Sequence, residues 1–379
     1  MPEPNVSMPE APAGDSVRPL LEVRDLEVSF SSRMGLASSL VGKKPIIARA
    51  VDGVSLSLGE GEVLALAGES GCGKTTLARS IMGFVQPRAG EILFEGRPLG
   101  RKLREYRRHV QMVYQDPTGA LNPRQTIYES VAEGVRIHKL SGDEDELVSQ
   151  ALSRAGLRPP ERFFLLYPHE LSGGQRQRVV IAGALALEPR VIVADEPVSN
   201  LDASVRGEIL QLLLKLRKES RISVLIVTHD LGLAWTVADR VAVMYLGRIV
   251  EVGPTRDVLT QPMHPYTRAL LDVVPEPGGV DRPFLVGEPP DPTRIPSGCR
   301  FHPRCPEIAS GRARAAGIED RCRGEDLGLE ELRERHLAAC HLASAEGGTA
   351  RIATQPAAST AAPPTTGAQP ASGPDRPAP

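Results

Sequence analysis

The sequence lacks long hydrophobic runs, and it lacks an excess of either charge. No stretch of about 18 apolar residues occurs, which is what a membrane-spanning helix needs. The first 19 residues also lack the apolar core of a secretory signal. The 45 basic and 47 acidic side chains nearly cancel, which gives no electrostatic reason to expect nucleic acid or an anionic membrane as the main partner. We therefore expect a cytosolic protein with no nucleic-acid partner.

Cysteine is scarce as well, with five in 379 residues. Cys72 lies in a glycine-rich stretch, whereas Cys299, Cys305, Cys322 and Cys340 lie near the C-terminal end. In a reducing compartment such a group indicates metal chemistry more than disulfides. The four lack the closely spaced C-x₂-C pairs of common zinc sites.

Both ends of the chain have biased composition. Residues 1–19 are rich in Pro and Ala, and residues 346–379 in Ala, Pro and Thr. Neither has enough large apolar side chains to fold, so we expect two disordered tails. The segment between them is long enough for one large domain with additions.

Short apolar runs alternate with helical patterns between the tails, which predicts an α/β fold with a mostly parallel core sheet. The expected buried strands are 63–67, 110–114, 191–194 and 224–227. Residues 20–30 resemble an edge strand pair and 91–94 another strand, which predicts an antiparallel β flank. Helical patterns over 127–137 and 144–155 predict an inserted helical subdomain at about 116–180.

A phosphate-binding loop is the strongest single motif. It consists of Gly68, Glu69, Ser70, Gly71, Cys72, Gly73, Lys74, Thr75 and Thr76. The motif G-x-x-x-x-G-K-[ST] follows an apolar strand and precedes a predicted helix at 75–82, so backbone N–H groups and the helix N-terminus can bind phosphates. Lys74 is expected to bridge the outer phosphates of ATP, and Thr75 to bind Mg²⁺. A glycine-rich turn without a ligand is the alternative, and Cys72 is either a redox group or a small filler.

Two acids end the predicted strand at 191–194. Asp195 is placed to hold Mg²⁺ through water, and Glu196 to orient or deprotonate the attacking water. Taken alone, two acids at a strand end are also consistent with a helix cap.

Further segments follow in an order that resembles ABC ATPases. Leu171, Ser172, Gly173, Gly174 and Gln175 resemble the ABC signature, which in that family binds the ATP held by a partner subunit. Gln115 resembles the glutamine that senses Mg²⁺, and His229 the switch histidine that contacts the γ-phosphate. Ser199, Asn200, Leu201 and Asp202 resemble the loop that touches the partner subunit. Gly183 and Asn200 depart from the usual arginine and alanine.

The adenine-stacking aromatic of ABC ATPases is harder to place. Phe30 is the nearest aromatic at a strand end, although residues 31–45 intervene before the next apolar segment. Core packing is the alternative role for this ring.

The segments 115–124, 167–170 and 264–271 resemble the oligopeptide/dipeptide importer ATPases over about residues 20–343. The resemblance implies an ABC nucleotide-binding domain at 20–275 and a C-terminal extension at 276–345. It also implies a peripheral subunit on the cytoplasmic face of the cell membrane. The expected partners are a second related ATPase in a heterodimer, two permease subunits and an extracytoplasmic substrate-binding protein. Val198 and the Gly-Gln pair of the signature look more like the second ATPase subunit.

In some of these importers four such cysteines hold an iron–sulfur cluster. The resemblance therefore implies a [4Fe–4S] cluster on Cys299, Cys305, Cys322 and Cys340, although Cys322 follows Cys305 at an unusually long spacing. Zinc and free thiols remain the alternatives. Two other functions also remain open, a non-transport ABC ATPase acting on DNA or ribosomes and a redox or metal sensor switched by ATP.

Overall fold

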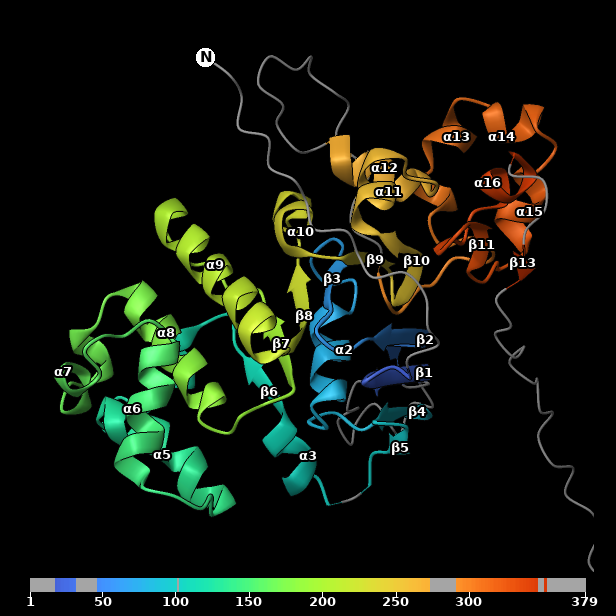
Figure 1. The fold of residues 1–379 in the computed structure, drawn as a ribbon. Helices are drawn as coiled ribbons and strands as arrows, with labels where there is room; N and C mark the ends of the chain where they lie inside the picture. Colours follow the sequence, from blue (N-terminus) through green and yellow to red (C-terminus); the bar gives the residue numbers. More distant parts are fainter. Residues whose placement is uncertain (1–17, 32–45, 101, 273–290, 347–350, 353–379) are drawn as a thin grey trace, which may run out of the picture.

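The computed structural model describes residues 18–31, 46–100, 102–272, 291–346 and 351–352 (Figure 1). A large twisted sheet lies at the centre, with a smaller sheet beside it, a helical lobe on one side and a C-terminal lobe on the other. No helix in these ranges is both long and apolar enough to cross a membrane.

The large sheet has the strand order β13-β11-β12-β10-β9-β3-β8-β7-β6 over the described residues. Its parallel part confirms the four predicted buried strands and adds one more. The bounds are β3 Val63–Ala67, β6 Val110–Val113, β7 Val191–Asp195, β8 Ser223–Thr228 and β9 Arg240–Tyr245. The pairs β9–β3, β3–β8, β8–β7 and β7–β6 are all parallel. Strand β10, Arg248–Pro254, pairs antiparallel with β9.

Apolar side chains on both faces of β7 explain why this sheet is central. Ile192 and Ala194 belong to a core shared with the helical lobe, whereas Val191 and Val193 belong to a second core that includes the small sheet. A strand buried on both faces needs the continuous apolar run that the sequence shows. The sheet is therefore the layer between two cores.

The small sheet confirms the antiparallel flank but corrects one detail. Its strands are β1 Leu21–Ser31, β2 Ile47–Leu58, β4 Ala89–Phe94 and β5 Arg97–Pro98, in the order β2-β1-β4-β5. The prediction of an edge strand pair at 20–30 is wrong, because these residues form one long strand with a partner on each side. Sequence reasoning missed β2, although its Val54, Leu56 and Leu58 are buried in strict alternation with less buried residues.

Helices cover the large sheet and connect its strands. Those outside the helical lobe are α2 Lys74–Ile81, α3 Arg104–His109, α9 Ala203–Ser220, α10 Leu231–Val237 and α11 Thr255–Thr260. Helix α2 begins at the lysine of the glycine-rich loop and buries Leu77, Ala78 and Ile81. The predicted helix at 75–82 is thus confirmed, one residue earlier.

The helical lobe contains the two helices predicted at 127–137 and 144–155 (Figure 1). Its elements are α4 Pro117–Ala120, α5 Ile127–His138, α6 Glu144–Arg154, α7 Glu161–Phe164, the 3₁₀ turn Pro168–Glu170 and α8 Gly173–Leu185. Capping boxes at Thr126 and Ser172 begin α5 and α8, because each hydroxyl accepts a hydrogen bond from an N–H that the helix leaves unpaired. The domain limits at 116–180 remain a prediction.

The C-terminal lobe is built from short elements. They are α12 Pro265–Asp272, the 3₁₀ turn His302–Arg304, α13 Pro306–Ala309, α14 Arg312–Ala315, α15 Glu319–Gly324, β11 Glu330–Arg333, β12 His336–Ala338, α16 His341–Glu346 and β13 Arg351–Ile352. Strand β12 pairs antiparallel with β10, so this lobe extends the large sheet. Within the expected tail from 346, residues 351–352 pair with β11, and the tail stays a prediction. Residues 1–17, 347–350 and 353–379 of the two expected tails lie outside the described residues.

Candidate nucleotide-binding site

The glycine-rich loop joins the carboxyl end of β3 to the first turn of α2. Gly68, Gly71 and Gly73 have φ angles of 151°, 79° and 112°, which side chains with a Cβ rarely adopt. A Cβ on Gly68 would lie 2.2 Å from the Met244 carbonyl oxygen, and one on Gly73 would lie 2.0 Å from the Ala50 carbonyl oxygen. The loop can therefore pass this close to its neighbours only with glycine at both positions.

Lys74 is held inside this loop by backbone oxygens. Its Nζ donates hydrogen bonds to the carbonyl oxygens of Gly68 at 2.7 Å and Glu69 at 2.8 Å. The Cys72 sulfur lies 3.8 Å from the same ammonium. Cys72 is buried in the core beside β1 and β3, and burial raises the pKa of its thiol.

Side chains from different strands meet beyond this loop because parallel strands end at one edge of the sheet. Thr75 Oγ1 donates a hydrogen bond to Asp195 Oδ1 at 3.2 Å, joining α2 to the end of β7. Burial raises the pKa of the Asp195 carboxyl, the Thr75 hydrogen bond opposes this, and the charge of Glu196 adds to the rise. Burial is the largest of these effects, so the pKa rises even though the Thr75 hydroxyl favours the carboxylate.

Glu196 is the centre of a polar triangle. Gln115 Nε2 donates to Glu196 Oε2 at 3.1 Å, and His229 Nδ1 lies 3.0 Å from Glu196 Oε1. Gln115 follows β6 and His229 follows β8, the two strands that flank β7. The backbone of Glu196 has a φ of 46°, and its N–H donates to the Val227 carbonyl at 3.0 Å. The Ser199 hydroxyl donates to the Glu196 carbonyl at 3.1 Å. A helix cap, the alternative for these acids, does not describe this arrangement.

The segment 171–175 begins α8. The Ser172 hydroxyl accepts a hydrogen bond from the Gln175 N–H, and the Gln175 side chain accepts one from the Ser172 N–H. Leu171 is buried, and a Cβ on Gly174 would lie 2.5 Å from Val205 Cγ1 of α9. Gly173 and Gly174 therefore start a helix packed closely against α9, with Ser172 exposed at its N-terminus.

The segment 199–202 leads from this edge into α9. Leu201 is buried and Asp202 is exposed at the N-cap position of α9. Asn200 Nδ2 donates a long hydrogen bond of 3.5 Å to the Gln115 carbonyl. Asn200, which replaces the usual alanine, therefore contacts the same loop as the Glu196 triangle.

Phe30 lies near the end of β1 and is 48% exposed. The alternative of core packing is wrong for this ring. Its role at the adenine stays a prediction, since residues 32–45 lie outside the described part of the chain.

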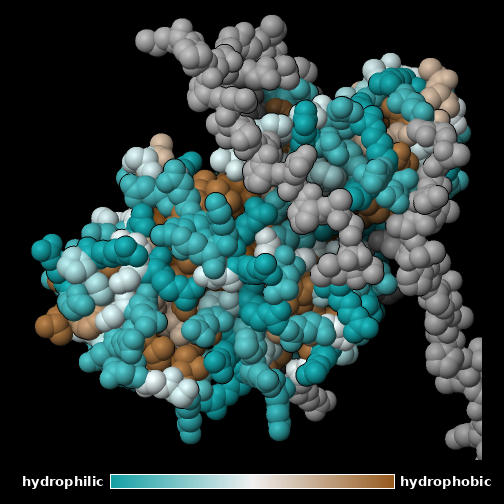
Figure 2. Space-filling view, viewed as in Figure 1, coloured by the Kyte–Doolittle hydropathy of each residue, from teal (hydrophilic) through white to brown (hydrophobic). Residues whose placement is uncertain are grey.

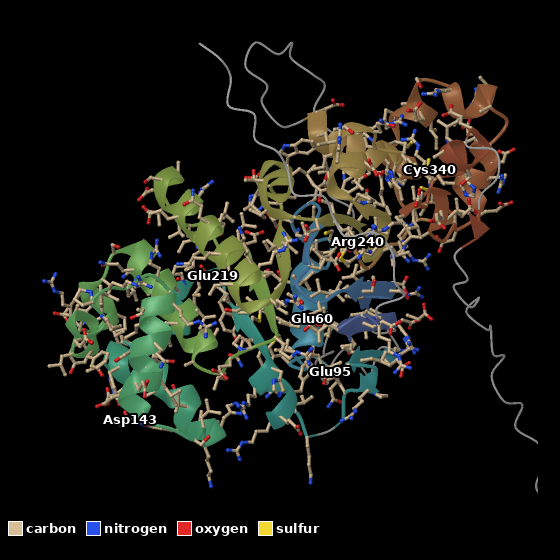
Figure 3. All side chains as sticks on the ribbon, in the orientation of Figure 1. Glu60, Glu95, Asp143, Glu219, Arg240 and Cys340 are labelled. Carbon is tan, nitrogen blue, oxygen red and sulfur yellow. The ribbon has the colours of Figure 1, made fainter. Side chains whose placement is uncertain are left out.

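The four C-terminal cysteines converge on one small pocket of about 20 Å³ in the C-terminal lobe, together with His302 and His341. Cys340 marks its position in Figure 3. Burial raises the pKa of the Cys299 thiol to about 12, and the other three cysteines push it in the same direction. Within the described ranges, no group of three or more His, Cys, Asp or Glu side chains is arranged so that it could hold a metal ion.

Two contacts to the glycine-rich loop were not predicted from the sequence. Arg304, from the C-terminal lobe, forms an ion pair with Glu69. Tyr266 of α12 accepts a hydrogen bond from the Glu69 N–H at 2.9 Å. No local pattern in the sequence links Tyr266 or Arg304 to Glu69.

The chain matches two known families and several known proteins. Residues 51–199 match the family "ABC transporter", and residues 250–310 match "Oligopeptide/dipeptide transporter, C-terminal region". The oligopeptide transport ATP-binding protein AppF of Bacillus subtilis is 41% identical over 86% of this chain and 98% of its own length. OppF of Salmonella typhimurium, with the same description, is 45% identical over 76% of this chain and 88% of its own.

A solved structure supports the fold. The ATP-binding cassette MJ0796, solved as a dimer in a post-hydrolysis state with ADP and Pi, matches with a TM-score of 0.54 and 30% identity. The match covers 62% of this chain and 99% of that one. These matches, which together extend over most of its length, show that the chain belongs to the oligopeptide transport ATP-binding proteins of the ABC transporter family.

Proposed function

We propose that this protein hydrolyses ATP to energise an ABC importer of peptides or similar small solutes. The observation that carries the proposal is the triangle of Glu196 with Gln115 and His229, located beside a complete phosphate-binding loop. A protein that only bound nucleotide would need the loop but not a carboxylate oriented by two polar partners.

Each residue has a proposed role in the reaction. The loop residues 68–76 bind the phosphates, and Lys74 exchanges its carbonyl partners for phosphate oxygens. Asp195, Thr75 and Gln115 would hold Mg²⁺, which would neutralise charge on the phosphates. Glu196 orients and deprotonates the attacking water, while His229 fixes the carboxylate and contacts the γ-phosphate. Phe30 stacks on the adenine.

The signature acts on a partner subunit's nucleotide. In support, Ser172 is exposed at the N-terminus of α8, where its capping box with Gln175 orders the first turn. A helix N-terminus with free N–H groups is suited to bind phosphate oxygens. The proposed dimer therefore pairs this chain with a second related ATPase, and residues 199–202 lie at their contact.

The proposed location is the cytoplasmic face of the membrane, where two permease subunits bind the ATPase pair and an extracytoplasmic protein delivers the substrate. The named relatives are peptide transport proteins, which supports this assembly. The helical lobe also has apolar side chains in solvent, with Leu165 at 83% and Tyr167 at 38% exposure. Figure 2 shows apolar surface in this part of the lobe, over α7. Such side chains are suited to contact a membrane subunit.

The test is Glu196→Gln in the assembled transporter. We expect Mg-ATP to bind and phosphate release at this site to fall roughly 10²- to 10⁴-fold, because the amide cannot accept the proton of water. The matched control is Glu188→Gln, an exposed glutamate that also has a positive φ, of 52°. Undiminished turnover at the Glu196→Gln site, measured as phosphate release and as peptide uptake into proteoliposomes, would contradict the proposal.

We also propose that Cys299, Cys305, Cys322 and Cys340 take up a [4Fe–4S] cluster. The support is that all four line one pocket, and that four thiolates suit such a cluster in number and softness. Because burial favours the protonated thiols, uptake requires deprotonation and a rearrangement of the pocket. A cluster would supply a one-electron redox centre.

Iron content and visible absorbance of anaerobically purified protein test this second proposal. We expect Cys340→Ser to lose both signals and Cys72→Ser to keep them, because Cys72 lies in the phosphate loop. A colourless, iron-free native protein would contradict the cluster. Bound zinc in such a sample would favour the zinc alternative, and its absence the free thiols.

A further inference from the structure

An acidic side chain lies in the loop that we propose binds the phosphates of ATP. Glu69 follows the first glycine of this loop, and its side chain is only 21% exposed. Arg304, whose side chain is 9% exposed, donates from Nη1 to one carboxylate oxygen at 3.0 Å and from Nη2 to the other at 3.2 Å. Two parallel hydrogen bonds between a guanidinium and a carboxylate fix orientation as well as charge.

A second group from the C-terminal side holds the backbone of the same residue. The Tyr266 hydroxyl accepts the Glu69 N–H at 2.9 Å. The Tyr266 ring is fully buried, with ring centroids 4.5 Å from Tyr245 and 5.4 Å from Phe301. The position of the hydroxyl is therefore fixed by packing.

Glu69 connects the two C-terminal contacts to Lys74. The Glu69 carbonyl accepts a hydrogen bond from Lys74 Nζ at 2.8 Å. The side chain, the N–H and the carbonyl of Glu69 thus bind Arg304, Tyr266 and Lys74 respectively. A movement of Arg304 or Tyr266 would shift the residue that holds the phosphate-binding ammonium.

Charge gives the Arg304 contact a second effect. An unpaired carboxylate in this loop would repel nucleotide phosphates, and little solvent is present to screen it. The guanidinium of Arg304 cancels that charge. Removal of Arg304 should therefore weaken binding more for nucleotides with more phosphates.

We propose that the C-terminal region positions the phosphate-binding loop for ATP, with Arg304 and Tyr266 as positioning residues that act through Glu69. This inference rests on the proposed ATPase function and deepens it. Both residues adjoin the cysteine pocket, since Arg304 precedes Cys305 and Tyr266 follows Pro265, and both of those neighbours line it. The C-terminal lobe would then be part of the nucleotide site.

The alternative is that the ion pair only attaches the C-terminal lobe to the rest of the protein. The two explanations differ in what they predict for affinity. A purely structural contact changes the free energy of unfolding and leaves the Kd of the folded protein for nucleotide unchanged. A positioning contact changes the Kd and makes that change depend on phosphate number.

The experiment measures Kd values of the full-length chain for Mg-ATP, Mg-ADP and AMP by calorimetry, with urea unfolding of the nucleotide-free protein alongside. Arg304→Gln should raise the Kd for Mg-ATP on the order of tenfold, and that for AMP much less. Arg304→Lys should recover part of the loss, because it keeps the charge without the fork. Tyr266→Phe removes only the hydroxyl and should weaken Mg-ATP binding several-fold. The matched control is Arg312→Gln, which removes another arginine of the same lobe that pairs with Glu307 and Glu346.

The double variant Arg304→Gln/Glu69→Gln gives the sharpest result. Removing the carboxylate that Arg304 neutralises should restore the part of the Mg-ATP affinity that is lost through the unpaired charge, whereas the part lost with the positioning contact should stay lost. The proposal is overturned if Arg304→Gln and Tyr266→Phe bind Mg-ATP like the native chain, if the loss is equal for AMP, or if the double variant shows no recovery. If Arg304→Gln does not fold, the Kd values of Tyr266→Phe and Glu69→Gln for Mg-ATP still distinguish a positioning contact from a purely structural one. A native chain that bound no Mg-ATP would instead refute the proposed function.

Discussion

Gly71 and Gly73 allow the close packing of the phosphate loop to be measured separately from its backbone conformation. Both have a positive φ, 79° and 112°. A Cβ on Gly71 meets nothing within 4 Å, whereas one on Gly73 would lie 2.0 Å from the Ala50 carbonyl oxygen and 2.8 Å from Met244 Cε. Alanine at position 71 therefore carries only backbone strain, and alanine at position 73 carries strain and a collision with β2.

The expected magnitudes follow from these two terms. A positive φ costs an L-residue roughly 1–2 kcal/mol, which is the prediction for Gly71→Ala. Overpacking adds about 1–3 kcal/mol, so Gly73→Ala should destabilise by about 2–5 kcal/mol. The Ala50 carbonyl belongs to a strand and can move little, which favours the upper part of this range.

The assay is urea unfolding of both nucleotide-free variants, followed by circular dichroism, with the m-value checked for constancy. The difference between the two free energies of unfolding measures the collision alone. Equal losses for Gly71→Ala and Gly73→Ala would refute the reasoning, because they would show that the loop does not need its close approach to β2.

Three further predictions concern single side chains. Phe30→Ala should raise the Kd for ATP by roughly fivefold to a hundredfold, as expected when a ring that stacks on the base is lost. The control Phe84→Ala, which removes another half-exposed ring, should leave the Kd unchanged. Equal Kd values for the two variants would show that Phe30 does not bind the adenine. Burial acts to raise the pKa of the Asp52 carboxyl, but the hydrogen bond and charge of Arg300 prevail and hold the pKa below its ordinary value. Asp52→Asn should therefore cost about 3 kcal/mol at pH 7, since it leaves a buried guanidinium unpaired. The native advantage is fully present above the ordinary pKa of an aspartate and should shrink as the pH falls from there through the lowered native pKa, because the unfolded chain takes up its proton first. An advantage that stayed constant between unfolding at pH 7 and unfolding on the acid side of this range would contradict the pairing. Gly183 lies within α8 with open space around it, so Gly183→Ala should stabilise the protein by about 0.5–1 kcal/mol in thermal unfolding, and a loss would show that the space is filled.

Much of the nucleotide site could be predicted because its residues end strands with strong local patterns. Asp195, Glu196 and His229 each follow a run of buried apolar residues, and a parallel sheet brings such ends together. The orientation of Glu196 by both Gln115 and His229 could not be derived from spacing, since these residues come from three separate strands.

The features that the sequence did not predict share a physical cause, which is pairing between residues far apart in the chain. The strand pair expected at 20–30 is in fact the single strand β1. Its partner β2 begins beyond residues 32–45, and a local pattern does not show which strand lies alongside another. The joining of β12 to β10 and the Arg304–Glu69 ion pair connect parts of the chain far apart in sequence. Such contacts depend on the folded arrangement and leave no local signal.

The backbone conformation of Glu196 sets stability against the side chain that the site carries. Its φ of 46° is one that a residue with a side chain rarely adopts, and holding it there costs on the order of 1–3 kcal/mol. Glycine would relax this conformation, so a chain selected for durability alone would favour losing the carboxylate. The position proposed for catalysis is therefore one where the side chain needed for hydrolysis and the residue best for stability differ. Replacing Glu196 by glycine is expected to stabilise the fold and to abolish turnover together.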